Sequence, residues 1–143
     1  MFIRLTPEQI PRLWDAIKFA VLQIDDISKG DQALYLNRLL HALLSSKAWC
    51  IVRMDKDRKL LGISILRILD NDITGERTVF IECLYSFAHA HIDIWKEVLD
   101  LTIKYAKKEK CSKITAYSSN PRIFELAGEL GFSERYRYLE MEI

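Results

Sequence analysis

The stretch from Lys113 to Phe132 constrains the fold more than any other part of this 143-residue chain. It contains a short β-prone run, Ile114 to Tyr117, and a break at Ser118-Ser119-Asn120, where either of the last two residues can cap a helix. Pro121 then opens a run with apolar residues at helical spacing, and Gly131 ends it. Ser or Asn suits an N-cap, Pro suits the first helical position and Gly suits a left-handed stop. The stretch therefore predicts a strand, a capped helix and a return towards the sheet.

Length and composition are typical of one globular domain spanning residues 1–143. Half of the residues are hydrophobic, and 21 Lys and Arg nearly balance 20 Asp and Glu. This balance gives no reason to expect a nucleic-acid or membrane partner, and no apolar run approaches the ~20 residues that span a bilayer. The N-terminus lacks a signal-peptide pattern. Cys50, Cys83 and Cys111 form an odd, widely spaced set, which is typical of free thiols in a reducing compartment, so we expect a cytoplasmic protein.

The N-terminal third predicts one strand and two helices. Phe2 to Leu5 is a short strand candidate. Thr6-Pro7-Glu8-Gln9 is close to a capping box with Pro at the first helical position, and it starts a helix that continues to about Ile24. The acidic pair Asp25-Asp26 is interpreted as a solvated loop, and Asp31 can cap the second helix.

The middle of the chain predicts three strands followed by a long helix. Trp49 to Met54 and Leu60 to Leu69 flank a polar turn and therefore predict a β-hairpin. Thr78 to Tyr85 is a third strand, and a helix follows from about residue 91 or 93 to residue 108. A strand–helix–strand connection of this length joins parallel strands, whereas the hairpin is antiparallel. Together with a last strand from Phe132 to Ile143, these elements predict an α/β fold with a mixed central sheet and helices on both faces.

In this order, the elements resemble the GNAT (Gcn5-related N-acetyltransferase) superfamily. The strand–Asn–helix–Gly-Phe unit between residues 114 and 132 carries the most specific part of the resemblance, which extends over nearly the whole chain. The resemblance implies transfer of an acetyl or other acyl group from acyl-CoA to an amine. It leaves open whether the acceptor is a small molecule or a protein, and whether the protein is a monomer or a homodimer.

The resemblance also implies where acetyl-CoA would bind. In the family, the fourth and fifth strands diverge, and the pantetheine arm lies in the gap and bonds to the backbone of the fourth strand. The corresponding residues here are Leu84, Tyr85 and Ser86. Asn120 corresponds to the family's Asn at the start of the last helix, although its role as a helix cap is a sufficient explanation for it.

The loop that enters the long helix corresponds to the family's diphosphate motif, Q/R-x-x-G-x-G/A. Here it is Ala90-His91-Ile92-Asp93-Ile94-Trp95, with Asp93 and Trp95 at the two small positions. Glycines let a backbone approach phosphates, and N–H groups at a helix N-terminus bind anions, whereas a carboxylate repels them. The resemblance implies cofactor contacts from His91, Ile92 and Asp93. The residues equally allow a helix that caps itself and holds no phosphate.

Glu82 matches the position of the Glu that acts as general base in many members of the family. A base there takes a proton from the substrate ammonium, so that the neutral amine can attack the thioester. The alternative is a carboxylate in an ordinary cleft, paired with a neighbouring Arg or Lys. The family's acid, a Tyr on the last helix, is replaced by Ala127, and Tyr117 or Tyr85 could substitute for it. Each of these tyrosines is also explained as a sheet residue at the rim.

Two functions from different classes therefore remain open. The first is an acyl-CoA-dependent N-acyltransferase with Glu82 as base. The second is a catalytically inactive GNAT-fold binding or assembly module, for example a viral or prophage accessory protein, which the altered loop and Ala127 favour. His89 and His91 form a His-x-His pair, but no third ligand is near in sequence, so we expect no metal site.

Overall fold

The computed structural model of the chain describes residues 1–24, 27, 30–118 and 120–143. Its centre is one five-stranded sheet in the order β1-β2-β3-β4-β5. The strands are β1 (Phe2–Arg4), β2 (Ala48–Met54), β3 (Leu60–Asp70), β4 (Arg77–Ser86) and β5 (Lys113–Ala116). Neighbouring strands are antiparallel except for β4 and β5, which are parallel. The predicted mixed α/β sheet is therefore confirmed.

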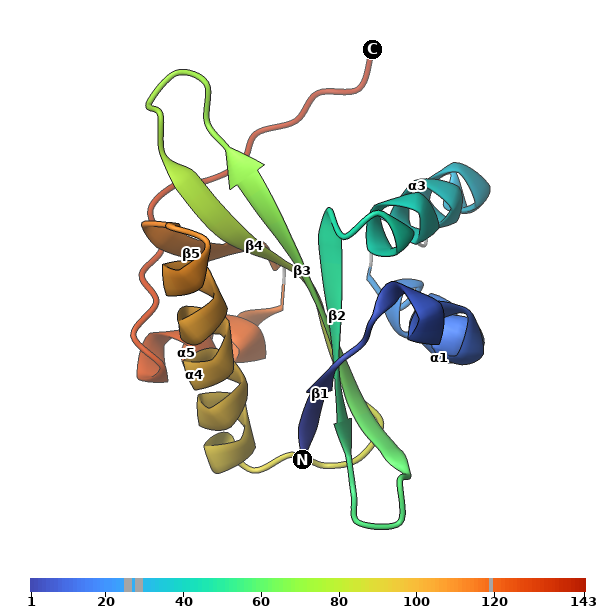
Figure 1. Cartoon of the computed structure of the whole chain (residues 1–143). Coiled ribbons are helices and arrows are strands. Elements are labelled where there is room, and N and C mark those ends of the chain that lie inside the picture. Colours follow the sequence, from blue (N-terminus) through green and yellow to red (C-terminus); the bar gives the residue numbers. More distant parts are fainter. Residues whose placement is uncertain (25–26, 28–29, 119) are drawn as a thin grey trace.

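Helices cover both faces of this sheet (Figure 1). The short 3-10 helix η1 (Pro7–Gln9), α1 (Ile10–Val21) and α3 (Gln32–Leu44) lie on one face. On the other face lies α4 (Ile92–Lys108), and α5 (Pro121–Glu129) lies towards the β5 end of the sheet. The face that carries α1 and α3 is called the α1/α3 face below, and the opposite face is called the α4 face.

Two hydrophobic clusters fix these layers, because successive residues of a strand point to opposite faces. On β2, Val52 packs under α1 and α3, whereas Ile51 packs towards α4. On β3, Ile65 packs under α1 and α3 and Leu66 packs towards α4, and neither residue is exposed. A central strand that is buried on both faces has a continuous run of apolar residues in its sequence, and both β2 and β3 have such a run.

The helix ends follow the predicted local chemistry, with one difference. The Asn120 side chain accepts a hydrogen bond from the backbone N–H of Arg122 at 3.0 Å, and Gly131 adopts φ +98°. The first helix is split into η1 and α1, because Pro11 has no N–H for an α-helical bond to Pro7. The predicted cap at Ser119 and the predicted loop at Asp25-Asp26 lie outside the described residues.

The predicted last strand from Phe132 to Ile143 is wrong, because the described segment has no regular secondary structure. It extends away from the sheet (Figure 1), and the side chains of Tyr136, Tyr138, Leu139 and Met141 are each more than four-fifths exposed. A β-prone segment forms a strand only where a neighbouring strand supplies hydrogen-bond partners. No strand of the described sheet pairs with this segment.

Two of the three free cysteines are buried in the sheet and should be unreactive in the folded protein. Burial is the main cause that raises the pKa of Cys50 and Cys83 to about 12. A thiol reacts as its thiolate, so at pH 8 these two should be alkylated roughly 10³-fold more slowly than a thiol with an ordinary pKa. Peptide mapping after alkylation should therefore find label on the less buried Cys111 first. Equal labelling of all three thiols before unfolding would contradict this placement.

Candidate active site

A β-bulge in β4 turns Glu82 towards the α1/α3 face. On the partner strand β3, Ile65 lies opposite Cys83 and the next residue, Leu66, lies opposite Ile81. Glu82 is therefore an extra residue in β4, without a partner of its own in the ladder. Bulges of this kind bend a strand and re-aim a side chain, often next to active sites.

The strands β4 and β5 separate at this bulge. Their parallel pairing begins at Thr78 with Lys113 and ends at Ile81 with Ala116. Leu84, Tyr85 and Ser86 continue to pair with β3, but on their β5 side the described sheet offers them no strand. The region beyond Ile81 and Ala116, where β4 and β5 no longer pair, is called the splay below. It leaves one backbone edge of the predicted pantetheine-binding residues without a strand partner.

The apex of the splay brings together the two residues predicted to be catalytic. Glu82 follows the last paired residue of β4, and Tyr117 follows the last paired residue of β5. The ring of Tyr117 lies 5.1 Å from that of Phe80, which is on β4, and 82% of the Tyr117 residue is exposed. Tyr117 therefore has an accessible phenol at the apex, as a proton donor needs.

Both carboxylate oxygens of Glu82 already have protein donors. The Nε atom of Arg67 donates to Oε1 at 2.6 Å, and the hydroxyl of Tyr35 donates to Oε2 at 3.1 Å. The Glu82 side chain is 12% exposed and that of Arg67 is 25% exposed, so this ion pair is largely withdrawn from water. The alternative interpretation of Glu82, a carboxylate paired with a neighbouring Arg, is therefore present in the structure.

Tyr35 and Arg67 are the members of this cluster that the sequence interpretation missed. Burial first, and the negative charge of Glu82 second, raise the pKa of Tyr35 well above its ordinary value, so its phenol remains a donor. A signal for Arg67 was present, because it is the single charge between Leu60 and Leu69, in a strand that is otherwise strongly apolar. Buried charges are usually paired, so an Arg on β3 and a Glu on β4 indicate each other.

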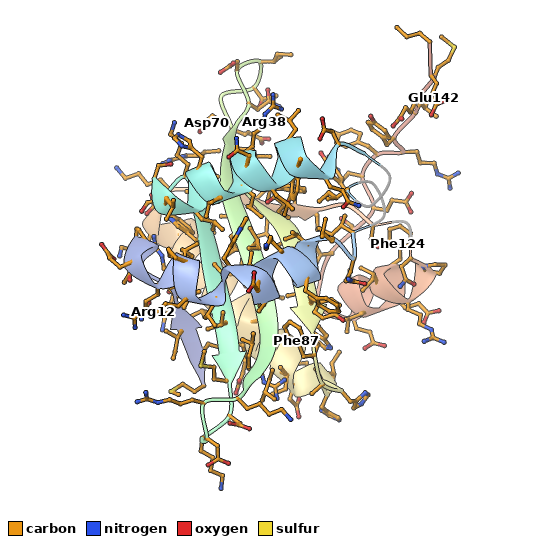
Figure 2. The ribbon with its side chains drawn as sticks, turned by 90° about the vertical axis from the view of Figure 1, so that its right-hand side faces the viewer. Arg12, Arg38, Asp70, Phe87, Phe124 and Glu142 are labelled. Carbon is orange, nitrogen blue, oxygen red and sulfur yellow. The ribbon has the colours of Figure 1, made fainter. Side chains whose placement is uncertain are left out.

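Aromatic side chains lie beside Glu82 on the same face. Tyr85 contacts Phe19 of α1 and Phe87 of the following loop, with ring centroids 5.9 and 4.9 Å away, and Phe19 stacks on Phe87 at 6.0 Å. Figure 2 shows Phe87 at the α1 side of the sheet and Phe124 on α5, beyond β4. Tyr85, the second candidate acid, thus belongs to a cluster of three rings and is less exposed than Tyr117.

The N-terminus of α4 is capped by its own residues. His91 is the N-cap, and its Nδ1 atom accepts a hydrogen bond from the backbone N–H of Asp93 at 3.4 Å. The Asp93 carboxylate lies 3.3 Å from the same Nδ1 atom, and both side chains are mostly exposed. Ile92 is the first residue of the helix. This end of α4 therefore presents a carboxylate at the point where the resemblance implies a diphosphate.

Trp95 packs against the sheet instead of the loop. It lines a cavity of about 20 Å³ between α4 and the sheet, together with Ile94 and Leu84. The Ser64 hydroxyl also faces this cavity from β3 and has no hydrogen-bond partner among the described residues. A space of this size holds about one water molecule. This cavity cannot hold a cofactor.

The residues described by the structure include no group of three His, Cys, Asp or Glu side chains placed to hold a metal ion. His89 and His91 both precede α4, and His91 is engaged with Asp93. Among the same residues, no helix is both long and apolar enough to cross a membrane.

Several solved structures with this fold are acetyltransferases. A probable acetyltransferase superposes with a TM-score of 0.74 at 13% identity, covering 100% of this chain and 97% of its own. A predicted acetyltransferase from Clostridium acetobutylicum, solved with acetyl-CoA, has a TM-score of 0.76 at 17% identity, covering 99% of this chain and 95% of its own. The ribosomal-protein-alanine N-acetyltransferase of Brucella melitensis has a TM-score of 0.67 at 18% identity and covers 100% and 99%.

The chain therefore has the fold of the GNAT acetyltransferases, as the resemblance implied. At identities of 13 to 18%, these likenesses establish the fold alone. No protein-family model and no curated protein matches the sequence. What the chain does has to be argued from its own site.

Proposed function

We propose that this chain is an acyl-CoA-dependent N-acyltransferase, which transfers an acetyl or related acyl group to an amine. The observation that carries the proposal is the splay of β4 and β5, with Glu82 and Tyr117 at its apex. The acetyl-CoA-containing structure from Clostridium acetobutylicum shares this fold, which supports acyl-CoA as the donor.

The residues present fit the pantetheine end of acyl-CoA. The unpaired backbone edge of Leu84, Tyr85 and Ser86 would bond to the amide groups of the arm as a neighbouring strand would. Asn120 would remain the cap of α5 and keep that helix beside the opening. Bound acyl-CoA would supply an acyl group activated as a thioester.

Protons would be handled by the two groups at the apex. Glu82 would accept a proton from the acceptor ammonium and pass it to solvent, which leaves a neutral amine. The amine nitrogen then forms the new C–N bond as the C–S bond breaks. Tyr117 would give its proton to the departing sulfur and recover the remaining proton of the amine. The products are an N-acyl amine, a free thiol and one proton released to solvent.

The residues of this chain fit the diphosphate end of acyl-CoA less well than the pantetheine end. A like-charge pair at 4 Å costs about 1 kcal/mol in water, and Asp93 would form such a pair with a phosphate. We therefore expect weak binding of acyl-CoA, dominated by the pantetheine and acyl end.

The self-capped α4 favours a second candidate function, a GNAT-fold binding or assembly module without catalysis. At the start of α4, the backbone N–H of Asp93 already donates a hydrogen bond to His91. The Glu82 carboxylate already accepts hydrogen bonds from Arg67 and Tyr35. Ala127 provides no phenol where the family has its acid. Partners would then meet the exposed aromatic side chains of residues 132–143.

The test is turnover of acetyl-CoA with a panel of primary amines, followed by thiol release and by mass spectrometry of the products. The acyltransferase proposal expects an N-acetylated amine and stoichiometric thiol. The module proposal expects neither, at any acceptor concentration. Thiol release without an acylated amine would be hydrolysis and would contradict both.

A further inference from the structure

At the apex of the splay, opposite charges lie side by side next to exposed aromatic rings. We infer that this site binds the zwitterionic head of a free α-amino acid with a large apolar or aromatic side chain. The inference rests on the proposed N-acyltransferase function and names its acceptor class. Three observations carry it: the terminal guanidinium nitrogens of Arg67, which have no partner among the described residues, the adjacency of the two opposite charges, and the rings on both sides of the pair.

Among the described residues, nothing occupies the edge of Arg67 that its two terminal nitrogens form. Its Nε atom is bonded to Glu82, while its two terminal nitrogens have no partner among the residues that the structure describes. The side chain is 25% exposed, so these nitrogens are reachable but only partly hydrated. A guanidinium fork of this kind takes a carboxylate through two parallel hydrogen bonds, which are stronger where water is scarce.

The two charges lie directly beside each other, which suits a molecule that carries both a carboxylate and an amine. Arg67 Nε and Glu82 Oε1 are 2.6 Å apart, so this contact is used within the pair and leaves the terminal nitrogens of Arg67 for a ligand. An α-amino acid carries its amine and its carboxylate on the same carbon. Its carboxylate can therefore lie on the terminal nitrogens of Arg67 while its amine lies at Glu82, each charge facing the opposite one. A simple amine would pair only with Glu82, and a simple acid would pair only with Arg67.

Aromatic rings flank the charges along β4, on the α1/α3 face. Phe80 lies directly opposite Arg67 in the β3–β4 register. The ring of Tyr117 packs against the ring of Phe80. On the other side of Glu82, Tyr85 is packed with Phe19 and Phe87, which are 51% and 40% exposed. Exposed apolar side chains grouped beside polar ones are typical of ligand-binding surfaces, and rings favour stacking partners. The acceptor's side chain would lie against one of these groups.

The mixed charge also argues against a polycationic acceptor at this position. Glu82 is the carboxylate of the described cluster, and Arg67 already neutralises it. A second ammonium group would therefore face a guanidinium. This distinguishes the site from one built to hold several amines.

The experiment measures binding without acyl-CoA, by calorimetry and thermal shift, with four probes of one shape. L-phenylalanine carries both charges, L-phenylalaninamide and 2-phenylethylamine lack the carboxylate, and 3-phenylpropionate lacks the amine. We expect L-phenylalanine to bind at least about tenfold more tightly than each of the others, because buried polar groups left unpaired penalise the analogue that lacks a partner.

Substitution then assigns the carboxylate contact. In Arg67→Gln, L-phenylalanine and its amide should bind alike, and in Arg67→Lys the preference should be reduced but present. Arg12→Gln is the matched control, since Arg12 is exposed near the start of α1 (Figure 2), and this variant should bind as wild type does. If Arg67→Gln does not fold, Arg67→Lys together with the wild-type probe series still decides the question.

Two outcomes would overturn the inference. One is wild-type affinity for 2-phenylethylamine, or for a polyamine, that equals or exceeds that for L-phenylalanine. The other is a carboxylate preference that survives in Arg67→Gln. Failure of this inference and failure of the proposed function give different results. Acetylation of other amines with no amino-acid binding rejects the acceptor class alone. Binding of L-phenylalanine with no turnover of acetyl-CoA rejects the transfer and keeps the site.

Discussion

Glu82→Gln is expected to lower the rate constant for acyl transfer by about 10²–10⁴-fold, the usual contribution of a general base. Gln keeps the shape of Glu and can still accept the hydrogen bond from Tyr35, which wild-type Glu82 accepts at 3.1 Å. It cannot take a proton from the acceptor ammonium. The measurement is thiol release under saturating acetyl-CoA and acceptor, together with a thermal melt that shows the variant is folded.

A matched control is Glu76→Gln. Glu76 is paired with Lys113 at 2.9 Å in an exposed ion pair near the start of β4, remote from the bulge. Exposed pairs contribute little to stability, so this variant should retain the wild-type rate. A Glu82→Gln rate within a factor of two of wild type would show that Glu82 only holds Arg67 and Tyr35 in place.

Leu66→Ala is expected to lower the free energy of unfolding by about 2–5 kcal/mol. Leu66 has no exposed surface, and it lies on β3 in the cluster that joins the sheet to α4, with Val79 and Ala106 among its members. Removing its side chain leaves a cavity that two sheet neighbours and a helix can close only in part. Chemical denaturation followed by circular dichroism measures the loss.

Leu69→Ala provides the comparison on the same strand with the same chemical change. Leu69 is 42% exposed near the end of β3, so its loss should be below about 1 kcal/mol. If the two variants lost equal stability, the placement of Leu66 between β3 and α4 would be wrong.

Local sequence signals predicted most of the fold because each boundary had a physical cause. Asn120, Pro121 and Gly131 define the ends of α5 through capping, a fixed φ and a left-handed stop. The double-sided apolar runs of β2 and β3 required a sheet covered on both faces, and both helical layers are present. The observed bounds of these strands differ from the predicted ones by a single residue.

The site was predicted only in part, since its geometry depends on register. Glu82 was identified as the candidate base, but the bulge that turns it towards α3 has no sequence signal of its own. Its donors, Tyr35 and Arg67, are 47 and 15 residues away along the chain. The predicted last strand contains β-prone residues such as Tyr136 and Tyr138, but a strand also needs a neighbouring strand, and residue type alone does not provide one.

The measurement that tests the central claim most directly is the melting temperature of the protein titrated with acetyl-CoA, in wild type and in Asp93→Asn. A ligand that binds only the folded state raises the melting temperature through mass action. We predict a rise in wild type, and the same rise at a several-fold lower concentration in Asp93→Asn. This substitution keeps the size of the side chain and removes a negative charge from the place where the diphosphate would lie. No rise in either protein at millimolar acetyl-CoA would contradict an acyl-CoA site in the splay of β4 and β5.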